Sequence, residues 1–176
     1  MTGVVAIDVG TVNFAIAWLR DDGRGQPQVG YMSVCDLTGR GANGCFRNLI
    51  SHLRSIEWIF VEHRPHIIIE KQMQSKHRTN VKALKMSQHV LAFFLNRHPD
   101  LVVREYPSTQ KSRYLGHGLS YAQRKREAVR VVSEWLADDP VGLDWFMALP
   151  KKDDVADCIL MSRCWWSDDP GARCSA

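Results

Sequence analysis

The sequence contains no long hydrophobic run, no paired cysteines and no basic leader. No apolar stretch approaches the roughly 18 residues that a membrane-spanning helix needs. The five cysteines, at positions 35, 45, 158, 164 and 174, are odd in number and form no Cys-x-x-Cys pair. The first residues lack a basic segment, so we expect no signal or transit peptide. These absences argue against a membrane protein or a disulfide scaffold and predict a protein of an intracellular, reducing compartment.

Length and composition are those of one folded domain. The chain has 176 residues, of which 45% are hydrophobic and 24% are charged. These values exclude a disordered or fibrous chain and leave too little sequence for two well-packed domains. We expect one domain over residues 1–167 and a tail over residues 168–176.

The net charge of +4 is unevenly distributed along the chain. Residues 71–130 hold 13 basic and 3 acidic side chains, whereas residues 131–176 hold 4 basic and 9 acidic ones. A strongly basic middle segment predicts a polyanionic partner, and among polyanions it favours nucleic acid. A merely solvated basic surface is the alternative that charge alone does not exclude.

Hydrophobic periodicity predicts an α/β protein with a mixed sheet. Short apolar or alternating runs predict strands, and apolar residues at helical spacing predict helices. We expect strands at 4–8, 13–20, 29–35, 66–70 and 101–106, and helices at 45–63, 81–96, 121–137 and 153–165. Three antiparallel strands followed by alternating helices and strands indicate a layered sheet with helices on both faces.

Carboxylates stand where three of these elements end or begin. Asp8 ends the first strand, Glu70 ends the strand at 66–70, and Asp153, Asp154 and Asp157 open the last helix. Taken singly, an Asp before Gly is usually a turn residue, and acids in a first helical turn are favoured by the helix dipole. Asp157 is harder to explain in this way, because it interrupts an apolar surface and needs a partner there.

Clustered carboxylates without His or Cys ligands suit hard cations such as Mg²⁺ or Mn²⁺. A pair of such ions is well suited to phosphodiester cleavage. Beside the basic segment, the acids therefore predict a metal-dependent nuclease with metal ligands at Asp8, Glu70, Asp153, Asp154 and Asp157. We expect two Mg²⁺ ions in each site, with Mn²⁺ as a substitute.

Three stretches resemble the motifs of RuvC-type Holliday junction resolvases, above all the poxvirus enzymes and their fungal mitochondrial relatives. They are Ala6-Ile-Asp8-Val-Gly10-Thr-Val-Asn13, Ile67-Ile-Ile-Glu70-Lys-Gln72 and Lys151-Lys-Asp153-Asp154-Val-Ala-Asp157. The resemblance implies an RNase H-like fold, a homodimer, and Mg²⁺-dependent symmetric nicking of four-way DNA junctions. It also implies a viral source and action in the host cytoplasm.

The resemblance assigns catalytic roles to Asp8, Glu70, Asp154 and Asp157. It further implies a catalytic or phosphate-binding lysine, for which Lys111 and Lys125 are the candidates, with Arg126 competing for the place of Lys125. The role of Asp153 stays open.

Basic side chains that precede or line the later helices are expected to bind the DNA backbone. For Arg124, Arg126 or Arg130 taken singly, an exposed helix face is an equally good explanation, whereas the acid-free run from Lys71 to Lys85 favours a phosphate track. They are Lys71, Lys76, Arg78, Lys82, Lys85, Arg113, Arg124, Arg126 and Arg130.

Two groups of aromatic residues allow more than one interpretation. Trp135, Trp145 and the Trp165-Trp166 pair could stack on unpaired bases, although a core or interface position is commoner. Phe93, Phe94 and Leu95 cannot all face one core, so their helix is a candidate dimer interface.

Several other functions fit parts of the sequence. The first motif also resembles the phosphate hairpin of actin-like ATPases and sugar kinases, but 176 residues cannot hold their two lobes, so we expect no nucleotide cofactor. A binding module without catalysis would gain nothing from clustered acids. A nuclease of the same fold acting on RNA or on other branched DNA is not separable by sequence.

Overall fold

The computed structural model describes residues 3–41, 43–72, 80–116 and 118–168. Its strands are β1 (Gly3–Val9), β2 (Asn13–Asp21), β3 (Pro27–Asp36), β4 (His66–Glu70) and β5 (Val103–Tyr106). Its helices are α1 (Gly44–Ser55), α2 (Glu57–His63), α3 (Val81–Arg97), the 3₁₀ helix η1 (Ser108–Arg113), α4 (Tyr121–Trp135), α5 (Pro140–Ala148) and α6 (Lys152–Asp168). Among these described residues, no helix has both the length and the apolar character needed to cross a membrane.

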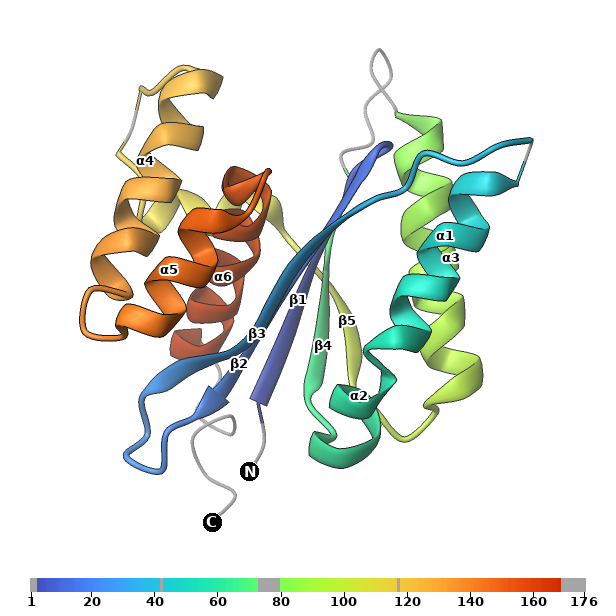
Figure 1. Cartoon of the computed structure of the whole chain (residues 1–176), viewed down its shortest axis with the longest axis horizontal. Helices are drawn as coiled ribbons and strands as arrows, with labels where there is room; N and C mark the ends of the chain where they lie inside the picture. Colours follow the sequence, from blue (N-terminus) through green and yellow to red (C-terminus); the bar gives the residue numbers. More distant parts are fainter. Residues whose placement is uncertain (1–2, 42, 73–79, 117, 169–176) are drawn as a thin grey trace.

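The strands form one five-stranded mixed sheet in the order β3-β2-β1-β4-β5 (Figure 1). β1, β2 and β3 pair antiparallel, while β4 runs parallel to both β1 and β5. The predicted strand order, with three antiparallel strands first and parallel strands after them, is confirmed. The parallel pairing of β1 and β4 brings their carboxyl ends to the same edge of the sheet.

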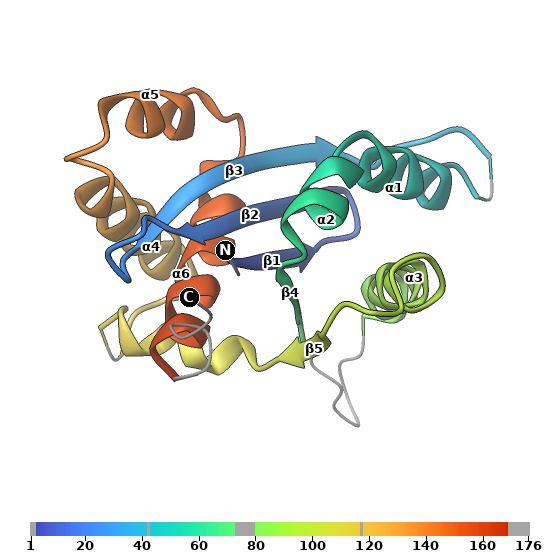
Figure 2. The ribbon, with the colours of Figure 1, turned by 90° about the horizontal axis from the view of Figure 1, so that it is seen from below.

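Helices cover both faces of the sheet, which gives two hydrophobic cores. α4, α5 and α6 lie on one side, and α1, α2 and α3 lie on the other (Figures 1 and 2). Successive residues of β1 alternate between them, because strand side chains point to opposite faces. Val4 and Ala6 pack in the core with α6, whereas Val5 and Ile7 pack in the core with α1 and α3.

The predicted helix at 45–63 is two helices. The helix is interrupted at Ile56, which has φ −110° and ψ 14° and separates α1 from α2. Leu53, Ile56, Ile59 and Phe60 are nevertheless all buried. The apolar spacing thus continues across the break, so hydrophobic periodicity alone could not reveal it.

Helix α5 was not predicted, since no element was expected between residues 138 and 152; Pro140 and Gly142 are both common in loops. Pro140 instead occupies the first turn, where its missing N–H costs nothing. The Asp139 side chain caps the helix by accepting a hydrogen bond from the Gly142 N–H at 3.0 Å.

Smaller boundary differences occur elsewhere. β5 begins at residue 103 rather than 101, α4 ends at 135 rather than 137, and α6 extends over 152–168 rather than 153–165.

Candidate active site

Two adjacent strands carry the first two acids. Ile7 of β1 pairs with Ile69 of β4 in parallel register, so Asp8 and Glu70 follow side by side at one edge of the sheet. Gly10 then lets β1 turn tightly into β2. Its N–H donates to the Asn13 carbonyl oxygen at 2.9 Å, and an added Cβ would lie only 2.6 Å from that same oxygen.

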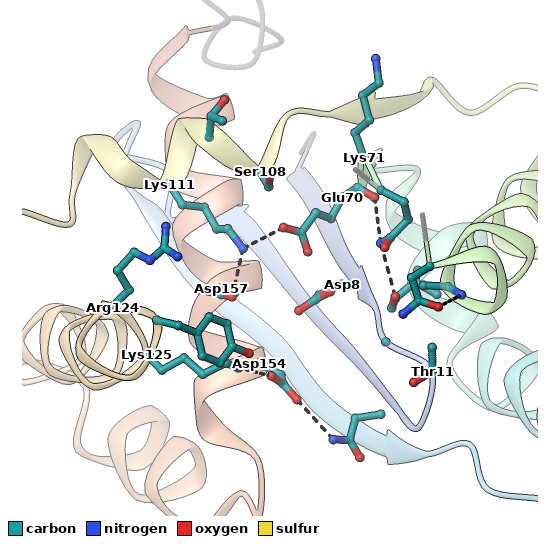
Figure 3. A pocket seen from close by; sticks show the side chains of 18 of the residues that line it. Asp8, Thr11, Glu70, Lys71, Ser108, Lys111, Arg124, Lys125, Asp154 and Asp157 are labelled. Atoms are coloured by element: carbon teal, nitrogen blue, oxygen red, sulfur yellow. Dashed lines mark hydrogen bonds and ion pairs between the residues drawn. The ribbon is translucent and has the colours of Figure 1, made fainter. Parts of the chain in front are cut away.

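Helix α6 brings the remaining acids to the same edge. Asp154 and Asp157 stand one turn apart at the start of α6, on the face toward the sheet. Together with Asp8 and Glu70 they line a cleft of about 790 Å³ (Figure 3). Four acids from three elements far apart in the sequence therefore share one cavity.

Lys111 of η1 bridges two of these acids. Its Nζ lies 3.0 Å from Glu70 Oε1 and 3.0 Å from Asp157 Oδ2, and the residue is 8% exposed (Figure 3). Burial alone would lower the pKa of Lys111, but the charges of Asp157, Glu70 and Asp8 outweigh it and raise that pKa. Lys111 is therefore a fixed positive charge inside the cleft.

Lys125 of α4 forms a second bridge at the mouth of the cleft. Its Nζ lies 2.5 Å from Asp153 Oδ2 and 2.7 Å from Asp154 Oδ1. Burial opposes the charge on Lys125, but the hydrogen bonds to both aspartates raise its pKa. The Asn13 amide also donates to Asp154 Oδ2, at 3.5 Å (Figure 3). Asp153 is not among the residues that line the cleft; its contact is with Lys125.

The acids are more crowded than two lysines can neutralise. Burial, followed by the charge of Glu70, raises the pKa of Asp8 well above its usual value. Burial also raises the pKa of Asp157, despite Lys111. Burial favours the neutral form of Glu70 as well, but the charge and hydrogen bond of Lys111 lower its pKa. Glu70 is thus the charged member of the pair and Asp8 the one that retains its proton more readily.

The donor chemistry of this cleft fits a hard divalent cation. Asp8, Glu70, Asp154 and Asp157 offer only carboxylate oxygens, which Mg²⁺ and Mn²⁺ prefer. Burial raises the pKa of Asp8 and Asp157, so a cation beside these two carboxylates would stabilise their charged forms. Within the described part of the chain, no three His, Cys, Asp or Glu side chains are grouped to hold a metal ion. Instead the ammonium groups of Lys111 and Lys125 contact the acids.

The predicted DNA-binding residues fall into four groups. Lys71 and Arg124 line the cleft, and Lys82 and Lys85 lie exposed near the start of α3. Lys76 and Arg78 lie outside the described residues. The remaining predicted positions, Arg113, Arg126 and Arg130, are exposed and do not line the cleft.

Two of these arginines already contact acids. Arg113 pairs with Asp168, and Arg130 pairs with Glu127 and Glu134 on its own helix, with Arg130 Nη2 2.6 Å from Glu127 Oε1. Lys125 and Arg126 were alternative matches to the family's basic residue, and they lie in different places. Lys125 faces the cleft acids, whereas Arg126, the next residue on α4, is exposed outside the cleft.

Sequence reasoning missed several residues of the cleft. Thr11, Ser108, Thr109 and Ser112 contribute hydroxyl groups to its lining, and Tyr121 stands at the first position of α4. The signal for Tyr121 was its place directly after the Ser120 cap and four residues before Lys125, where helical neighbours meet.

The aromatic residues divide between the core and the surface. Trp165 and Trp166 are buried, at 6% and 3% exposure, and Phe93 and Phe94 also belong to the core. The interpretation of Trp165-Trp166 as core is confirmed, whereas Phe93 and Phe94 are not available to an interface.

Three solved structures with a similar fold cover more than nine tenths of this chain. Fowlpox virus resolvase, determined with substrate Holliday junction DNA, has a TM-score of 0.62 and 19% identity, with 95% of this chain and 98% of that chain covered. Thermus thermophilus RuvC has a TM-score of 0.68 and 17% identity, covering 97% and 98%. Yeast mitochondrial Holliday junction resolvase Ydc2 has a TM-score of 0.65 and 16% identity, covering 94% and 79%. The RNase H-like fold predicted from the sequence is confirmed.

The chain is also similar in sequence to a viral protein. Over 96 residues the chain is 35% identical to uncharacterized protein 97L of invertebrate iridescent virus 3, a match over 53% of this chain and 44% of that protein. The chain therefore spans less than half the length of this relative. The family model described as Poxvirus A22 protein matches residues 2–167, nearly the whole chain. With β1, β4 and the acidic start of α6 inside that match, the chain belongs to the Poxvirus A22 protein family.

Proposed function

We propose that this protein is a Holliday junction resolvase, a structure-selective DNA endonuclease that cuts four-way junctions by paired symmetric nicks. The observation that carries the proposal is the cleft in which Asp8, Glu70, Asp154 and Asp157 converge from β1, β4 and α6. Partly buried acids facing two lysines are arranged for phosphodiester chemistry rather than for structural support alone.

Family membership and the named relatives support the substrate. Fowlpox virus resolvase and Thermus thermophilus RuvC have both been determined with Holliday junction DNA. Poxvirus family membership supports the viral origin and the action in host cytoplasm that the sequence resemblance implied.

The side chains of the cleft divide the chemical work. Lys111, held between Glu70 and Asp157, places a permanent positive charge where negative charge develops on the phosphate during cleavage. Lys71 and Arg124 at the cleft walls hold the flanking phosphates. Lys125 contributes a second charge that Asp153 keeps at the cleft mouth.

We assign the two predicted Mg²⁺ ions to Asp8, Glu70, Asp154 and Asp157. Bound Mg²⁺ would supply Lewis-acid stabilisation of the phosphate oxygens and lower the pKa of water for attack on phosphorus. We leave Asp153 out of this set and assign it to Lys125, because it contacts that ammonium and does not line the cleft.

The test compares cleavage of a synthetic four-way junction, a linear duplex, a fork and an RNA–DNA hybrid, each with Mg²⁺, Mn²⁺ or EDTA. We expect paired nicks in the junction alone, activity with either metal, and none in EDTA. Equal cutting of linear duplex would overturn junction resolution, and preferred cutting of the hybrid would favour a nuclease of the same fold acting on RNA.

We further propose that α3 forms the interface of a homodimer, which two symmetric nicks require. The stripe of Val81, Lys85, Gln88, Ala92 and Leu95 is exposed and repeats at intervals of four and three residues, the spacing of a helix–helix contact. It includes Lys85, one of the predicted DNA-binding residues, and is apolar at its two ends. Val81 and Leu95, at the two ends of this stripe, are 56% and 55% exposed. With Phe93 and Phe94 in the core, Leu95 is the exposed member of the predicted apolar trio.

Sedimentation analysis of Leu95→Glu tests the interface. We expect the wild type to sediment as a dimer and the variant as a folded monomer, because the change places a charge in an apolar contact. Lys82→Glu, at another exposed position of α3 outside the stripe, is the matched control and should stay dimeric. A dimeric Leu95→Glu variant would contradict this interface.

A further inference from the structure

Tyr121 is an exposed aromatic side chain at the edge of the candidate active site. It lines the cleft and is 67% exposed. The other exposed aromatic residues among those described are Trp58 and Trp145, at 41% and 39%. Both of these pack edge to face against Tyr31, whereas the Tyr121 ring meets no other aromatic ring in the described residues. Tyr121 therefore presents an aromatic face that the fold itself does not use.

The Tyr121 ring is held in place on one side only. A capping box formed by Ser120 and Gln123 anchors the start of α4, so the backbone of Tyr121 is fixed. Lys125 Nζ lies 5.4 Å from the ring centroid, within the range of a cation–π contact. Lys125 is in turn held by Asp153 and Asp154. One face of the ring thus takes a fixed cation, and the remaining ring surface is open to solvent.

The surroundings of the open ring favour a nucleotide. Arg124, three residues along α4, lines the same cleft and supplies a charge for a phosphate. The catalytic acids proposed above lie in that cleft too, so a strand placed for cutting passes the ring. A flat aromatic face beside a guanidinium is the arrangement that holds an unpaired base and its phosphate in single-strand binding proteins.

We propose that Tyr121 stacks on a nucleobase of the strand being cut, next to the scissile phosphate. The proposal rests on the nuclease function proposed above and adds to it a base-binding position. Stacking accepts any base, because every base has a π-face. Tyr121 consequently serves to hold a base displaced at the branch point and contributes little to sequence preference.

The test uses four-way junctions carrying 2-aminopurine at each nucleotide beside the branch point, bound to an Asp157→Asn chain that cannot cut. Stacking should quench the fluorescence at one position, and the quenching should persist when Tyr121→Phe is added. Adding Tyr121→Ala or Tyr121→Leu should remove the quenching and weaken junction binding about ten-fold. Trp145→Ala, an exposed aromatic residue of α5 outside the cleft, is the matched control and should change neither measurement.

Each outcome bears on one proposal or on both. If the junction binds and the quenching is the same with Tyr121→Ala, base stacking is overturned while junction resolution stands. A residue that acted only through Lys125 would not produce quenching at a defined nucleotide. If the wild-type chain neither binds nor cuts any junction, both proposals fail.

Discussion

Carboxylates gather at both ends of the sheet, but in different physical states. At the turn between β2 and β3, Asp21 Oδ1 accepts hydrogen bonds from the N–H groups of Gly23 and Gly25, at 2.8 and 3.0 Å. Asp22 Oδ1 accepts likewise from Arg24 and Gln26, at 2.7 and 3.0 Å.

The turn and the cleft differ in the groups that stabilise the charged form of each carboxylate. The hydrogen bonds from Arg24 and Gln26 lower the pKa of the solvent-exposed Asp22, whereas burial and the charge of Glu70 raise that of Asp8. Acids satisfied by their own backbone shape a turn. Acids gathered from distant segments and satisfied only in part retain the capacity to bind a cation. The following predictions test this difference.

The largest effect is expected from Asp157→Asn. Removing one cleft carboxylate should reduce junction cleavage on the order of a thousand-fold or more, because the cation that it helps to hold would lower the activation barrier by several kcal/mol. Single-turnover cleavage measures the loss. Asp144→Asn, an exposed acid of α5, makes the same change of charge outside the cleft and should cleave like the wild type. A fully active Asp157→Asn would remove Asp157 from the metal site.

Lys111→Met should have the next largest effect, on stability. It leaves the partly buried Glu70 and Asp157 without their shared partner, and because breaking a fully buried pair costs about 3 kcal/mol or more, we expect a loss of up to about that size. Urea denaturation in EDTA measures the free energy of unfolding. Mg²⁺ should stabilise the variant more than the wild type, since the cation would restore the missing charge. An unchanged unfolding free energy would mean that Lys111 is not needed to neutralise the cleft.

Asp8→Asn should change the free energy of unfolding by less than Lys111→Met does, and in the opposite direction, since it should stabilise the protein at neutral pH. Because the folded pKa of Asp8 lies above its usual value of 3.8, the folded state retains a proton that the unfolded state has lost, and stability falls as pH rises through this interval. In EDTA at pH 7, Asp8→Asn should therefore be more stable than the wild type. The difference should disappear below the unfolded pKa and also on addition of Mg²⁺ at pH 7. A wild type more stable than Asp8→Asn in EDTA at pH 7 would refute the shift.

The smallest effect is expected at the opposite end of the sheet. Asp22→Ala removes the acceptor of two turn N–H groups, so the thermal unfolding midpoint should fall slightly while cleavage stays at the wild-type rate. Asp22→Asn keeps an acceptor oxygen and should restore the midpoint. A loss of cleavage in Asp22→Ala would show that the two ends of the sheet are coupled.

Much of the fold was predictable because apolar periodicity reports burial directly. The sheet strands and the order of helices follow from runs such as Val4–Ile7 and Ile67–Ile69, all of whose residues are buried. The break at Ile56 was not predictable, since a buried residue keeps the same spacing whether or not the helix continues. Helix α5 was missed because Pro140 and Gly142 occur in loops as readily as in a first helical turn.

The acids of the cleft were predictable by type and position, since Asp8, Glu70, Asp154 and Asp157 stand where elements meet the sheet edge. Their partners were not. Lys111 and Lys125 were candidates on equal terms, and only the packing of η1 and α4 decided that one lies between Glu70 and Asp157 and the other between Asp153 and Asp154. Local sequence determines which chemistry each segment carries. Lys111 lies 41 residues from Glu70 along the chain, and Lys125 lies 28 residues from Asp153. Only tertiary packing brings such distant residues together, so the tertiary structure decides which charges meet.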